Sequence, residues 1–228
     1  MPARAGSQSI TNKNLVPLLG KGLVYHTLKA ACSSKIFDKV VLSTDIESLL
    51  EESETQWIRH KRFADLADHD TPMIRVVRDV LTRFSVPDQA WVWLLQPTSP
   101  FRVPADFKSI LELTENKRLK SIISVSQVGD RHALRHYLID NDHEIKRLIN
   151  KPKLDAFCPR QKLRPAVERN GMFYVLKART LRDHDVFDVS PCHGFEVPEE
   201  RSRNINEPYD YELAQFEAER LRAKGIWL

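Results

Sequence analysis

The sequence contains no apolar run near the roughly 20 residues that a membrane-spanning helix needs. Apolar runs such as Val40-Val41-Leu42 and Leu94-Leu95 are far shorter, and no basic-then-apolar leader opens the chain. We therefore expect a cytoplasmic protein that has no membrane partner.

Cysteine is scarce, with three residues in 228. Cys32, Cys158 and Cys192 are odd in number, lie far apart and form no CxxC pair. This pattern argues against a disulfide framework and against a thiolate zinc site. We expect three inert, reduced thiols.

A strong charge imbalance is also missing, since the formal net charge is only +4. The basic residues are scattered and do not form a run with interleaved aromatics, which argues against nucleic-acid binding and fits a small anionic substrate. With 42% hydrophobic and 29% charged residues, the chain has the composition of an ordinary globular protein. Its 228 residues are enough for a single α/β domain whose core needs no disulfide or structural metal.

Strand-like and helix-like patterns alternate along the chain. Short apolar or β-branched runs at residues 39–43, 91–95 and 121–125 predict strands. Between them, residues spaced three or four apart predict helices with one apolar stripe, and these residues are Val24, Leu28 and Ala31, followed by Ile74, Val77, Leu81 and Phe84. Such alternation predicts a doubly wound, mainly parallel α/β sheet.

Two further helices are marked by proline at their first turn. Pro104 opens a helix over residues 105–115, which we expect to bury Phe107, Ile110 and Leu111. Pro208 opens the last helix, with Asp210 in the first turn where the helix dipole favours an anion, and Gly225 closes it. The expected buried face of this last helix consists of Leu213, Ala214, Ala218 and Leu221.

Periodicity weakens between residues 127 and 169, where His132, His136 and His143 occur among Asp and Asn. We interpret this segment as an arm or lobe inserted into the single domain of residues 1–228. A solvated loop region is one alternative, and a substrate-covering or subunit-contacting role is the other, because long ordered insertions in compact domains are usually functional.

A small, polar and basic loop begins the chain, at residues 2–9, and Lys13-Asn14 follows it. Small residues let backbone amides approach a polyphosphate, and Arg4 and Lys13 would supply positive charge against the charge of a transition state. The loop is neither a Walker A nor a GxGxxG motif. An ordinary solvated turn is the alternative.

A second polar cluster, LLQPTSPFR at residues 94–102, follows a predicted buried strand. Open α/β sheets bind their ligands at this end of the strands. The alternative is a proline-bounded turn whose Thr98 and Ser99 only cap the next helix.

Five motifs in order resemble those of the CMP-N-acylneuraminate synthetase (acylneuraminate cytidylyltransferase) family. They are Ala3-Arg4 through Ser7 with Lys13-Asn14, Ser43-Thr44-Asp45, residues 62–72, LLQPTSPFR, and Asn170-Gly171-Met172-Phe173-Tyr174. The resemblance covers nearly the whole chain. It implies a nucleotide-diphospho-sugar transferase-like fold, CTP and an acidic nine-carbon sugar as substrates, Mg²⁺ as cofactor, and a homodimer in which the inserted arm reaches the neighbouring subunit.

The same resemblance implies roles for individual residues. Arg4 and Lys13 take the catalytic role, and the nucleotide-binding positions are Ala3, Arg4, Ser7, Lys13, Asn14 and Arg62. The sugar-binding positions are Gln96, Thr98, Asn170, Tyr174 and Phe187. Amide side chains can both donate to and accept from hydroxyl or amide groups, and aromatic rings can cover an N-acyl methyl. For Tyr174 and Phe187, a role as core aromatics is the alternative.

The chain departs from the family pattern near its C-terminus. Asn204 and Asn206 stand where the family typically has two aspartates that hold the divalent metal. An amide oxygen can still coordinate Mg²⁺ but adds no negative charge, so we expect weaker metal binding. Asp45 and Asp210 are the nearest candidates in sequence to replace the missing negative charge at the metal. The alternatives are that Asp45 caps a helix after a strand and that Asp210 is a first-turn acid of the last helix.

Other departures lie in the first half of the chain. Family members usually place an apolar strand before the Pro-Ala-Arg motif, which starts here at Pro2. Without such a strand we expect unpaired strand edges and an under-filled core. Gln8 replaces a usual lysine, and His69 lies between Asp68 and Asp70 where the family has an aspartate.

These residues lead to one main hypothesis and two alternatives. The main one is a cytidylyltransferase that joins CMP to a sialic-acid-like nonulosonic acid without a covalent nucleophile, by positioning and electrostatics. One alternative is a catalytically weakened homologue that binds a nucleotide or nucleotide sugar. The other is a cytidylyltransferase for a different acidic sugar, such as 3-deoxy-octulosonate.

Overall fold

Two sheets form the centre of this computed structural model, which describes residues 1–53, 55–149 and 159–227. One sheet has the order β1-β4-β5 with parallel strands, and the other has the order β11-β7-β10-β6. In the second sheet β11 is parallel to β7, whereas β10 runs antiparallel to both β7 and β6. The strands of the two sheets are β1 (Pro2–Ala3), β4 (Val41–Thr44), β5 (Ile58–Lys61), β6 (Trp91–Leu94), β7 (Ser121–Gln127), β10 (Val167–Lys177) and β11 (Cys192–Glu196).

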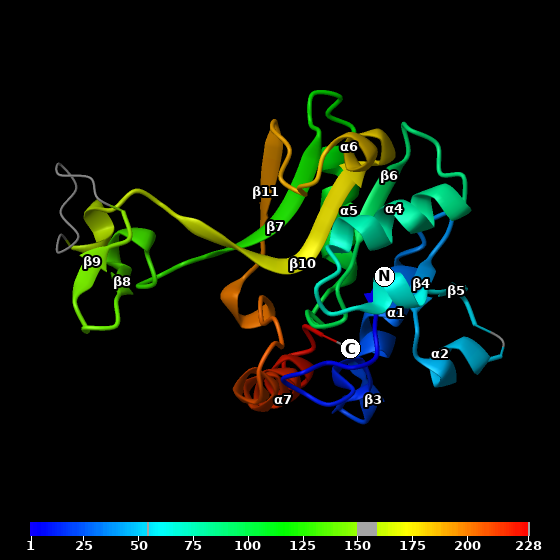
Figure 1. Ribbon diagram of the computed structural model, residues 1–228, viewed down its shortest axis with the longest axis horizontal. Coiled ribbons are helices and arrows are strands. Elements are labelled where there is room, and N and C mark those ends of the chain that lie inside the picture. Colours follow the sequence, from blue (N-terminus) through cyan, green and yellow to red (C-terminus); the bar gives the residue numbers. More distant parts are fainter. Residues whose placement is uncertain (54, 150–158, 228) are drawn as a thin grey trace.

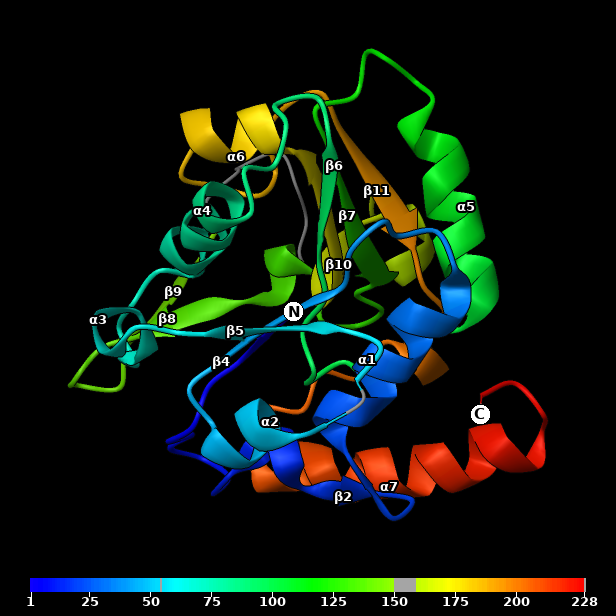
Figure 2. The same cartoon turned by 90° about the vertical axis from the view of Figure 1, so that its right-hand side faces the viewer.

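Helices cover both faces of the four-stranded sheet. Figure 2 shows α4 and α6 on one side of it and α5 on the other. Helix α1 packs beside α5, and α4 beside α6. The helices are α1 (Leu23–Ser34), α2 (Glu47–Glu51), α3 (Ala64–Ala67), α4 (Met73–Arg83), α5 (Pro104–Thr114), α6 (Ala178–Asp183) and α7 (Pro208–Ala223). The fold is therefore a mixed α/β fold with helices on both sides.

The predicted strands and helical stripes are confirmed, with one correction to the sheet. Strands β4, β6 and β7 occupy the predicted segments, and Val24, Leu28 and Ala31 of α1 are at most 3% exposed. The prediction of a mainly parallel sheet was too simple, because β10 is antiparallel to both neighbours. Strand direction depends on long-range pairing, which local periodicity does not encode.

Helix α5 begins at Pro104 as predicted, but one residue of its expected buried face is exposed. Phe107 and Ile110 are buried, whereas Leu111 is 42% exposed. Leu111 follows Ile110 by about 100° around the helix and so lies at the edge of the apolar stripe. Its side chain lines a cavity of about 440 Å³ that residues of β4 and β6 also line.

Helix α7 has the predicted start. Pro208 occupies its first turn, and the carboxylate of Asp210 accepts hydrogen bonds from the backbone N–H groups of Asn206 and Glu207, both at 2.9 Å. Ala214, Ala218 and Leu221 are buried as expected. Leu213 is half-buried and Gly225 follows the helix with a positive φ.

The segment predicted as an arm leaves the main body along β7 and β10. Figure 1 shows the small hairpin of β8 (Tyr137–Ile139) and β9 (Ile145–Arg147) well apart from the two sheets. A second hairpin, β2 (Pro17–Leu18) with β3 (Lys21–Gly22), packs near α7 at the other side of the molecule. The arm hairpin exposes Leu138, Ile139 and Ile145 by 59%, 66% and 61%.

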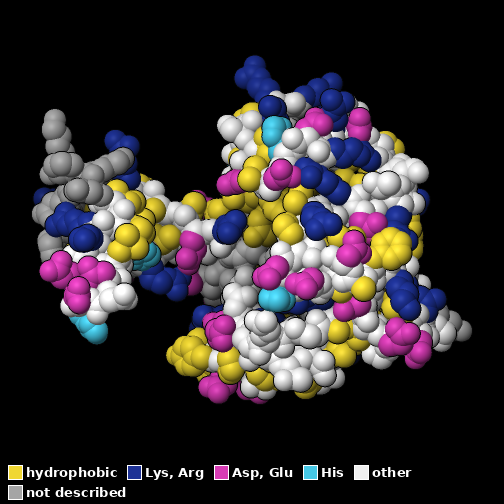
Figure 3. Space-filling view, in the orientation of Figure 1, with side chains coloured by type: hydrophobic (Ala, Val, Ile, Leu, Met, Phe, Trp, Pro, Cys, Tyr) yellow, Lys and Arg dark blue, Asp and Glu magenta, His cyan; other side chains and the backbone are white. Residues whose placement is uncertain are grey.

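The structure also describes two of the cysteines, the length of the helices and the charge on one face. Cys32 and Cys192 are free thiols, and Cys158 lies outside the described residues. Among the described residues, no helix is long and apolar enough to cross a membrane. On the face in Figure 3, cationic and anionic side chains are intermixed and form no single basic stripe.

Candidate functional site

The segments that follow β1, β5 and β6 meet at one cavity of about 360 Å³. Ligand sites at such strand ends are typical of open α/β sheets. Three cationic side chains reach this strand-end cavity, Arg4 and Lys13 from the loop after β1 and Arg62 from the segment after β5. Its full lining consists of Pro2, Arg4, Ser7, Gln8, Ser9, Lys13, Asn14, Arg62, Met73, Gln96, Pro97, Thr98 and Glu207.

The loop after β1 is held in place at both ends. The backbone N–H of Ala5 donates to Asp45 Oδ1 at 2.8 Å, so this carboxylate anchors the loop start. Asn14, 7% exposed, donates from Nδ2 to the carbonyl oxygen of Arg4 at 2.8 Å. Asn14 therefore orients the loop that carries Arg4 besides lining the cavity.

Lys13 ties the same loop to the C-terminal segment. Its Nζ donates to the carbonyl oxygen of Asn206 at 2.7 Å, and Ser9 Oγ donates to the same oxygen. Burial lowers the pKa of Lys13, and the carboxylates of Glu207 and Asp210 oppose that shift. Partial desolvation strengthens the attraction of this ammonium for an incoming anion.

Arg62 is a nearly buried cation beside the cavity, 4% exposed. It donates to the carbonyl oxygen of Ser43 at 2.9 Å, while its Nε has no hydrogen-bond partner among the described residues. Burial lowers its pKa, the carboxylate of Asp45 raises it, and the nearby Arg4 lowers it. A buried cation with an unused N–H is suited to bind an anionic oxygen.

The loop after β6 is fixed by the guanidinium of Arg102, which is 2% exposed. It donates to the carbonyl oxygens of Gln96 at 3.0 Å and Ser99 at 2.6 Å, and its Nε donates to that of Met172 at 3.0 Å. Burial lowers the pKa of Arg102 to about 9, which Asp106 opposes. The bonds set the backbone from which Gln96 and Thr98 face the cavity.

Gly171 lets the amide side chains of Gln96 and Asn204 lie close to the same stretch of backbone. Its φ is +75°, and a Cβ at this position would lie 2.7 Å from Gln96 Oε1 and 3.0 Å from Asn204 Nδ2. The neighbouring Asn170 is 5% exposed and accepts from Ser124 Oγ at 2.6 Å. Asn170 Nδ2 and Asn204 Oδ1 are buried and have no partner among the described residues. These two atoms are one unused donor and one unused acceptor, of which the Asn204 oxygen belongs to the amide beside Gln96.

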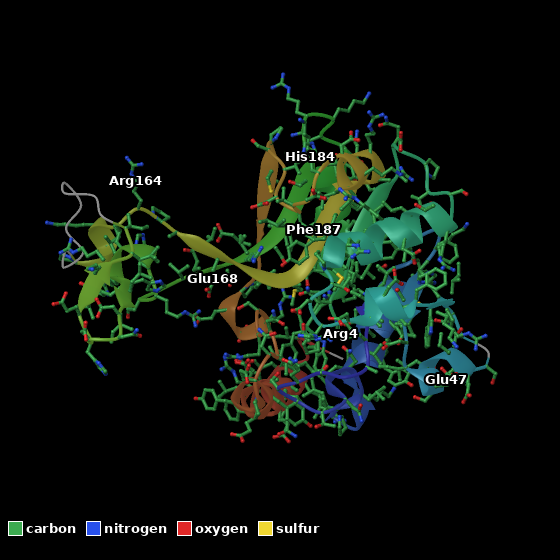
Figure 4. All side chains as sticks on the ribbon, viewed as in Figure 1. Arg4, Glu47, Arg164, Glu168, His184 and Phe187 are labelled. Atoms are coloured by element: carbon green, nitrogen blue, oxygen red, sulfur yellow. The ribbon has the colours of Figure 1, made fainter. Side chains whose placement is uncertain are left out.

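Tyr174 and Phe187 lie elsewhere. Their rings contact each other at 5.3 Å between centroids, and both pack against the core cluster under α4 and α6. Figure 4 shows Phe187 near α6, well separated from Arg4. The pKa of Tyr174 is raised by burial. The structure favours the core-aromatic interpretation and does not place either ring in the lining of the strand-end cavity.

The donor groups for a divalent metal are sparse at this cavity. Glu207 is the one carboxylate in the described lining, and Asn204, which lies outside that lining, has one buried, unpartnered oxygen. Asn206 is exposed, and its carbonyl oxygen already accepts from Lys13 and Ser9. The described residues contain one group of three metal-capable side chains, the exposed Asp68, His69 and Asp70. The fit to Mg²⁺ is thus limited to a neutral oxygen and one carboxylate.

The two compensating acids proposed from the sequence act in other ways. Asp45 accepts the N–H of Ala5, and Asp210 accepts two N–H groups at the start of α7. Their oxygens therefore organise the backbone around the strand-end cavity.

The cavity gathers seven of the sequence-predicted site residues, namely Arg4, Ser7, Lys13, Asn14, Arg62, Gln96 and Thr98. Ala3 is buried in β1, and Asn170, Asn204, Asn206, Tyr174 and Phe187 are not part of the described lining. Sequence reasoning missed Met73, Ser9 and Glu207. An acid directly before a proline-started helix was the available signal for Glu207, because that position lies at the helix end.

Comparisons with known proteins point in the same direction. A family model described as "Cytidylyltransferase" matches residues 1–217. A Legionella pneumophila protein named CMP-N,N'-diacetyllegionaminic acid synthase is 29% identical over 94% of this chain and 93% of its own length. The N-acylneuraminate cytidylyltransferase of Streptococcus agalactiae is 28% identical over 92% of this chain but only 50% of its own length, so the chain spans about half of that relative.

One solved structure supports the fold. The structure of CMP:2-keto-3-deoxy-manno-octonic acid synthetase complexed with CTP matches with a TM-score of 0.69 and covers 98% of this chain and 97% of its own. At 16% sequence identity, this likeness concerns the fold alone.

Proposed function

Because this chain belongs to the cytidylyltransferase family and is a nucleotidyltransferase, we propose that it joins CMP from CTP to a sialic-acid-like nonulosonic acid with release of pyrophosphate. The observation that carries the proposal is the convergence of Arg4, Lys13 and Arg62 on one cavity at the strand ends. Three cations, two from the loop after β1 and one from the segment after β5, match a ligand with several negative charges.

In the proposed reaction, the anomeric hydroxyl of the sugar attacks the α-phosphorus of CTP. A bond from the sugar oxygen to that phosphorus forms, and the hydroxyl proton is released to solvent. The bond from the phosphorus to the oxygen leading to the β-phosphate breaks, and pyrophosphate leaves. Arg4 and Lys13 stabilise the charge on the departing pyrophosphate, and Arg62 holds a phosphate oxygen through its unused N–H. Ser7 and Asn14 line the nucleotide side of the same cavity, after the buried Ala3.

Gln96 and Thr98 line the cavity from the loop after β6, and we assign them to the sugar. We assign Asn170 to the sugar as well, with its buried, unpartnered Nδ2 as the available donor from outside the described lining. Amide donors and acceptors can read hydroxyl and N-acyl groups of an acidic sugar. Tyr174 and Phe187 remain predictions for the sugar site that the geometry does not favour.

Mg²⁺ is proposed as the cofactor, with Asn204 Oδ1 and the carboxylate of Glu207 as protein oxygens near the triphosphate. Bound to CTP, the ion would neutralise phosphate charge and orient the leaving group. Since the protein supplies few charged ligands, the phosphate oxygens must supply most of the metal shell.

The names of the relatives support this substrate class. Two relatives that cover more than nine-tenths of this chain are named for legionaminate and N-acylneuraminate. A Campylobacter jejuni pseudaminic acid cytidylyltransferase is 34% identical over 36% of this chain and 37% of its own length. All three names denote nine-carbon acidic sugars, which favours this class over 3-deoxy-octulosonate.

The experiment is a pyrophosphate-release assay that combines each of four nucleoside triphosphates with N-acetylneuraminate, a legionaminate, a pseudaminate and 3-deoxy-octulosonate. We expect release only with CTP and a nonulosonic acid, in the presence of Mg²⁺. Release with 3-deoxy-octulosonate alone would contradict the substrate class, and release with another triphosphate would contradict the nucleotide.

A weakened, nucleotide-binding homologue is the second candidate, and Asn204 and Asn206 are the observation that favours it. Binding of CTP without turnover on any sugar of that panel would support this candidate. Turnover at a rate comparable to an active cytidylyltransferase measured in parallel would exclude it.

We also propose that the arm contacts a second copy of the chain. Support comes from Leu138, Ile139 and Ile145, which are exposed on a hairpin that stands away from the main body. Light scattering should give a dimer mass for the wild-type protein and a monomer mass for Ile139→Glu. An unchanged mass in this variant would contradict the arm contact, and Ile58→Glu, at an exposed apolar residue of β5, provides the matched control.

A further inference from the structure

His60 is a polar side chain at the one buried position of β5. It is 5% exposed, whereas Ile58, Arg59 and Lys61 of the same strand are exposed. Apolar residues are usual at such a position, because a buried imidazole needs a partner for each of its two ring nitrogens. The partners of His60 come from two other elements, β4 and α4.

The first partner is Ser43, which stands opposite His60 in the parallel ladder of β4 and β5. Ser43 Oγ lies 3.1 Å from His60 Nδ1. The second partner is Asp79 of α4, whose Oδ2 lies 3.1 Å from His60 Nε2. Because the carboxylate favours a proton on Nε2, Nδ1 is left to accept from the hydroxyl of Ser43. Burial lowers the pKa of His60 below its ordinary 6.5, which the carboxylate of Asp79 opposes, and a neutral imidazole fits this arrangement.

Asp79 holds the β5 segment at two points. Its contact with His60 is not aligned as a hydrogen bond, and neither Asp79 Oδ2 nor His60 Nε2 has a hydrogen bond among the described residues. Loss of either side chain would therefore leave a buried polar atom uncompensated. Asp79 Oδ1 accepts from Arg83 Nε at 3.0 Å, and the central carbon of that guanidinium lies 3.8 Å from the centre of the Phe63 ring. The carboxylate thus contacts His60 directly and Phe63 through Arg83.

Arg62 lies between these two points in the chain. Its guanidinium donates to the carbonyl oxygen of Ser43 at 2.9 Å, and its backbone N–H donates to that of Thr44 at 2.8 Å. Ser43 therefore bonds to His60 through its side chain and to Arg62 through its backbone. Ser43 and His60 are 2% and 5% exposed and do not line the strand-end cavity, so they act on a ligand there only through Arg62.

We propose that Asp79 and His60 are positioning residues that fix Arg62 for the triphosphate through Ser43. This role rests on the proposed function, which assigns Arg62 to a phosphate oxygen. Arg62 Nε is buried and has no partner among the described residues, so its contribution to binding depends on the direction in which its N–H points. A donor that is already fixed binds an anionic oxygen more tightly than a mobile one, because less side-chain entropy is lost on binding.

The test is calorimetric titration of CTP with Mg²⁺ into the wild-type protein and into Asp79→Asn, which keeps the side-chain shape and removes the charge. We expect the Kd for CTP to rise about 3- to 10-fold, a coupling typical of residues in one network. Asp88→Asn is the matched control, because Asp88 also pairs with an arginine, Arg182, but belongs to neither the cluster around His60 nor the cavity lining. This control should bind CTP with the wild-type Kd.

The same change in an Arg62→Gln background separates positioning from general stability. Because Asp79 acts through Arg62, the double variant should bind CTP as Arg62→Gln alone does, within about twofold. His60→Leu gives a second, independent variant, which should raise the Kd about 3- to 10-fold in the wild-type background and not in the Arg62→Gln background. Thermal melts show which variants are folded.

Two outcomes would overturn this role and leave the proposed function intact. One is a wild-type Kd for CTP in folded Asp79→Asn or folded His60→Leu. The other is an equal rise in Kd with and without Arg62, which would indicate a general structural effect. Wild-type protein that binds no CTP would contradict the proposed function and this role together.

Discussion

The variant Gly171→Ala tests whether the position of the Gln96 amide controls activity independently of the stability of the protein. The new Cβ would lie 2.7 Å from Gln96 Oε1, whereas ordinary contact begins at 3.4 Å, so the Gln96 amide must move by about 0.7 Å. A displacement near 1 Å in a substrate-positioning group is worth up to about 100-fold in rate. We therefore expect kcat/KM for the sugar to fall about 10- to 100-fold, while the Kd for CTP changes less than about twofold.

Gly225→Ala is the matched control for backbone strain. Gly225 has a φ of +64°, close to that of Gly171, but nothing lies within 4 Å of its added Cβ. Both variants should lose about 1–2 kcal/mol of stability, because an alanine in the left-handed region carries that cost. Steady-state kinetics and thermal melts of both proteins give the comparison. If Gly171→Ala retains wild-type kcat/KM for the sugar, Gln96 does not position it and the site assignment fails.

Three further predictions concern the metal, the nucleotide and the amino terminus. The double variant Asn204→Asp with Asn206→Asp should lower the Mg²⁺ concentration for half-maximal CTP binding or activity, and an unchanged titration would remove this segment from the metal site. Arg62→Gln should raise the Kd for CTP about 10- to 100-fold by loss of a charged donor, whereas Arg59→Gln, at an exposed cation in β5 three residues earlier, should not. Equal effects of the two variants would refute a specific role for Arg62. For Met1, the folded pKa of about 5 lies below the ordinary 8.0, so the unfolded state binds the extra proton between these values and stability falls as pH drops from 8 to 5. N-terminal acetylation should reduce that loss in urea unfolding, and identical pH profiles with and without the acetyl group would contradict the buried ammonium.

Local patterns in the sequence were sufficient for the four longest helices, α1, α4, α5 and α7, and for the strands β4, β6 and β7. The apolar stripes of α1 and α4 and the proline starts of α5 and α7 depend on neighbours three or four residues apart, so they are visible without the fold. The antiparallel direction of β10 depends on pairing across the sheet. The exposure of Leu111 depends on the cavity of about 440 Å³ that its side chain lines. No local signal encodes either feature.

The residues of the candidate site were likewise predictable only where a local rule applied. Arg62 lies far in sequence from Arg4 and Lys13, yet these residues follow β5 and β1 at the same end of the fold. The rule that open α/β sheets bind ligands at their strand ends predicts this meeting. Tyr174 was harder to place, because successive strand residues point to opposite faces. Phe173 packs in the core cluster with α5, and Tyr174 packs on the opposite side with Phe187. The motif therefore predicted that residues 170–174 belong to the site region, but it did not predict which face of β10 each side chain occupies.

Calorimetric titration of CTP with Mg²⁺ into the folded protein tests the central claim most directly. The account predicts saturable heat with one CTP per chain, and a much weaker response when Lys13 or Arg62 is replaced by a neutral residue. Absence of binding heat at several temperatures, in protein that melts cooperatively, would contradict it.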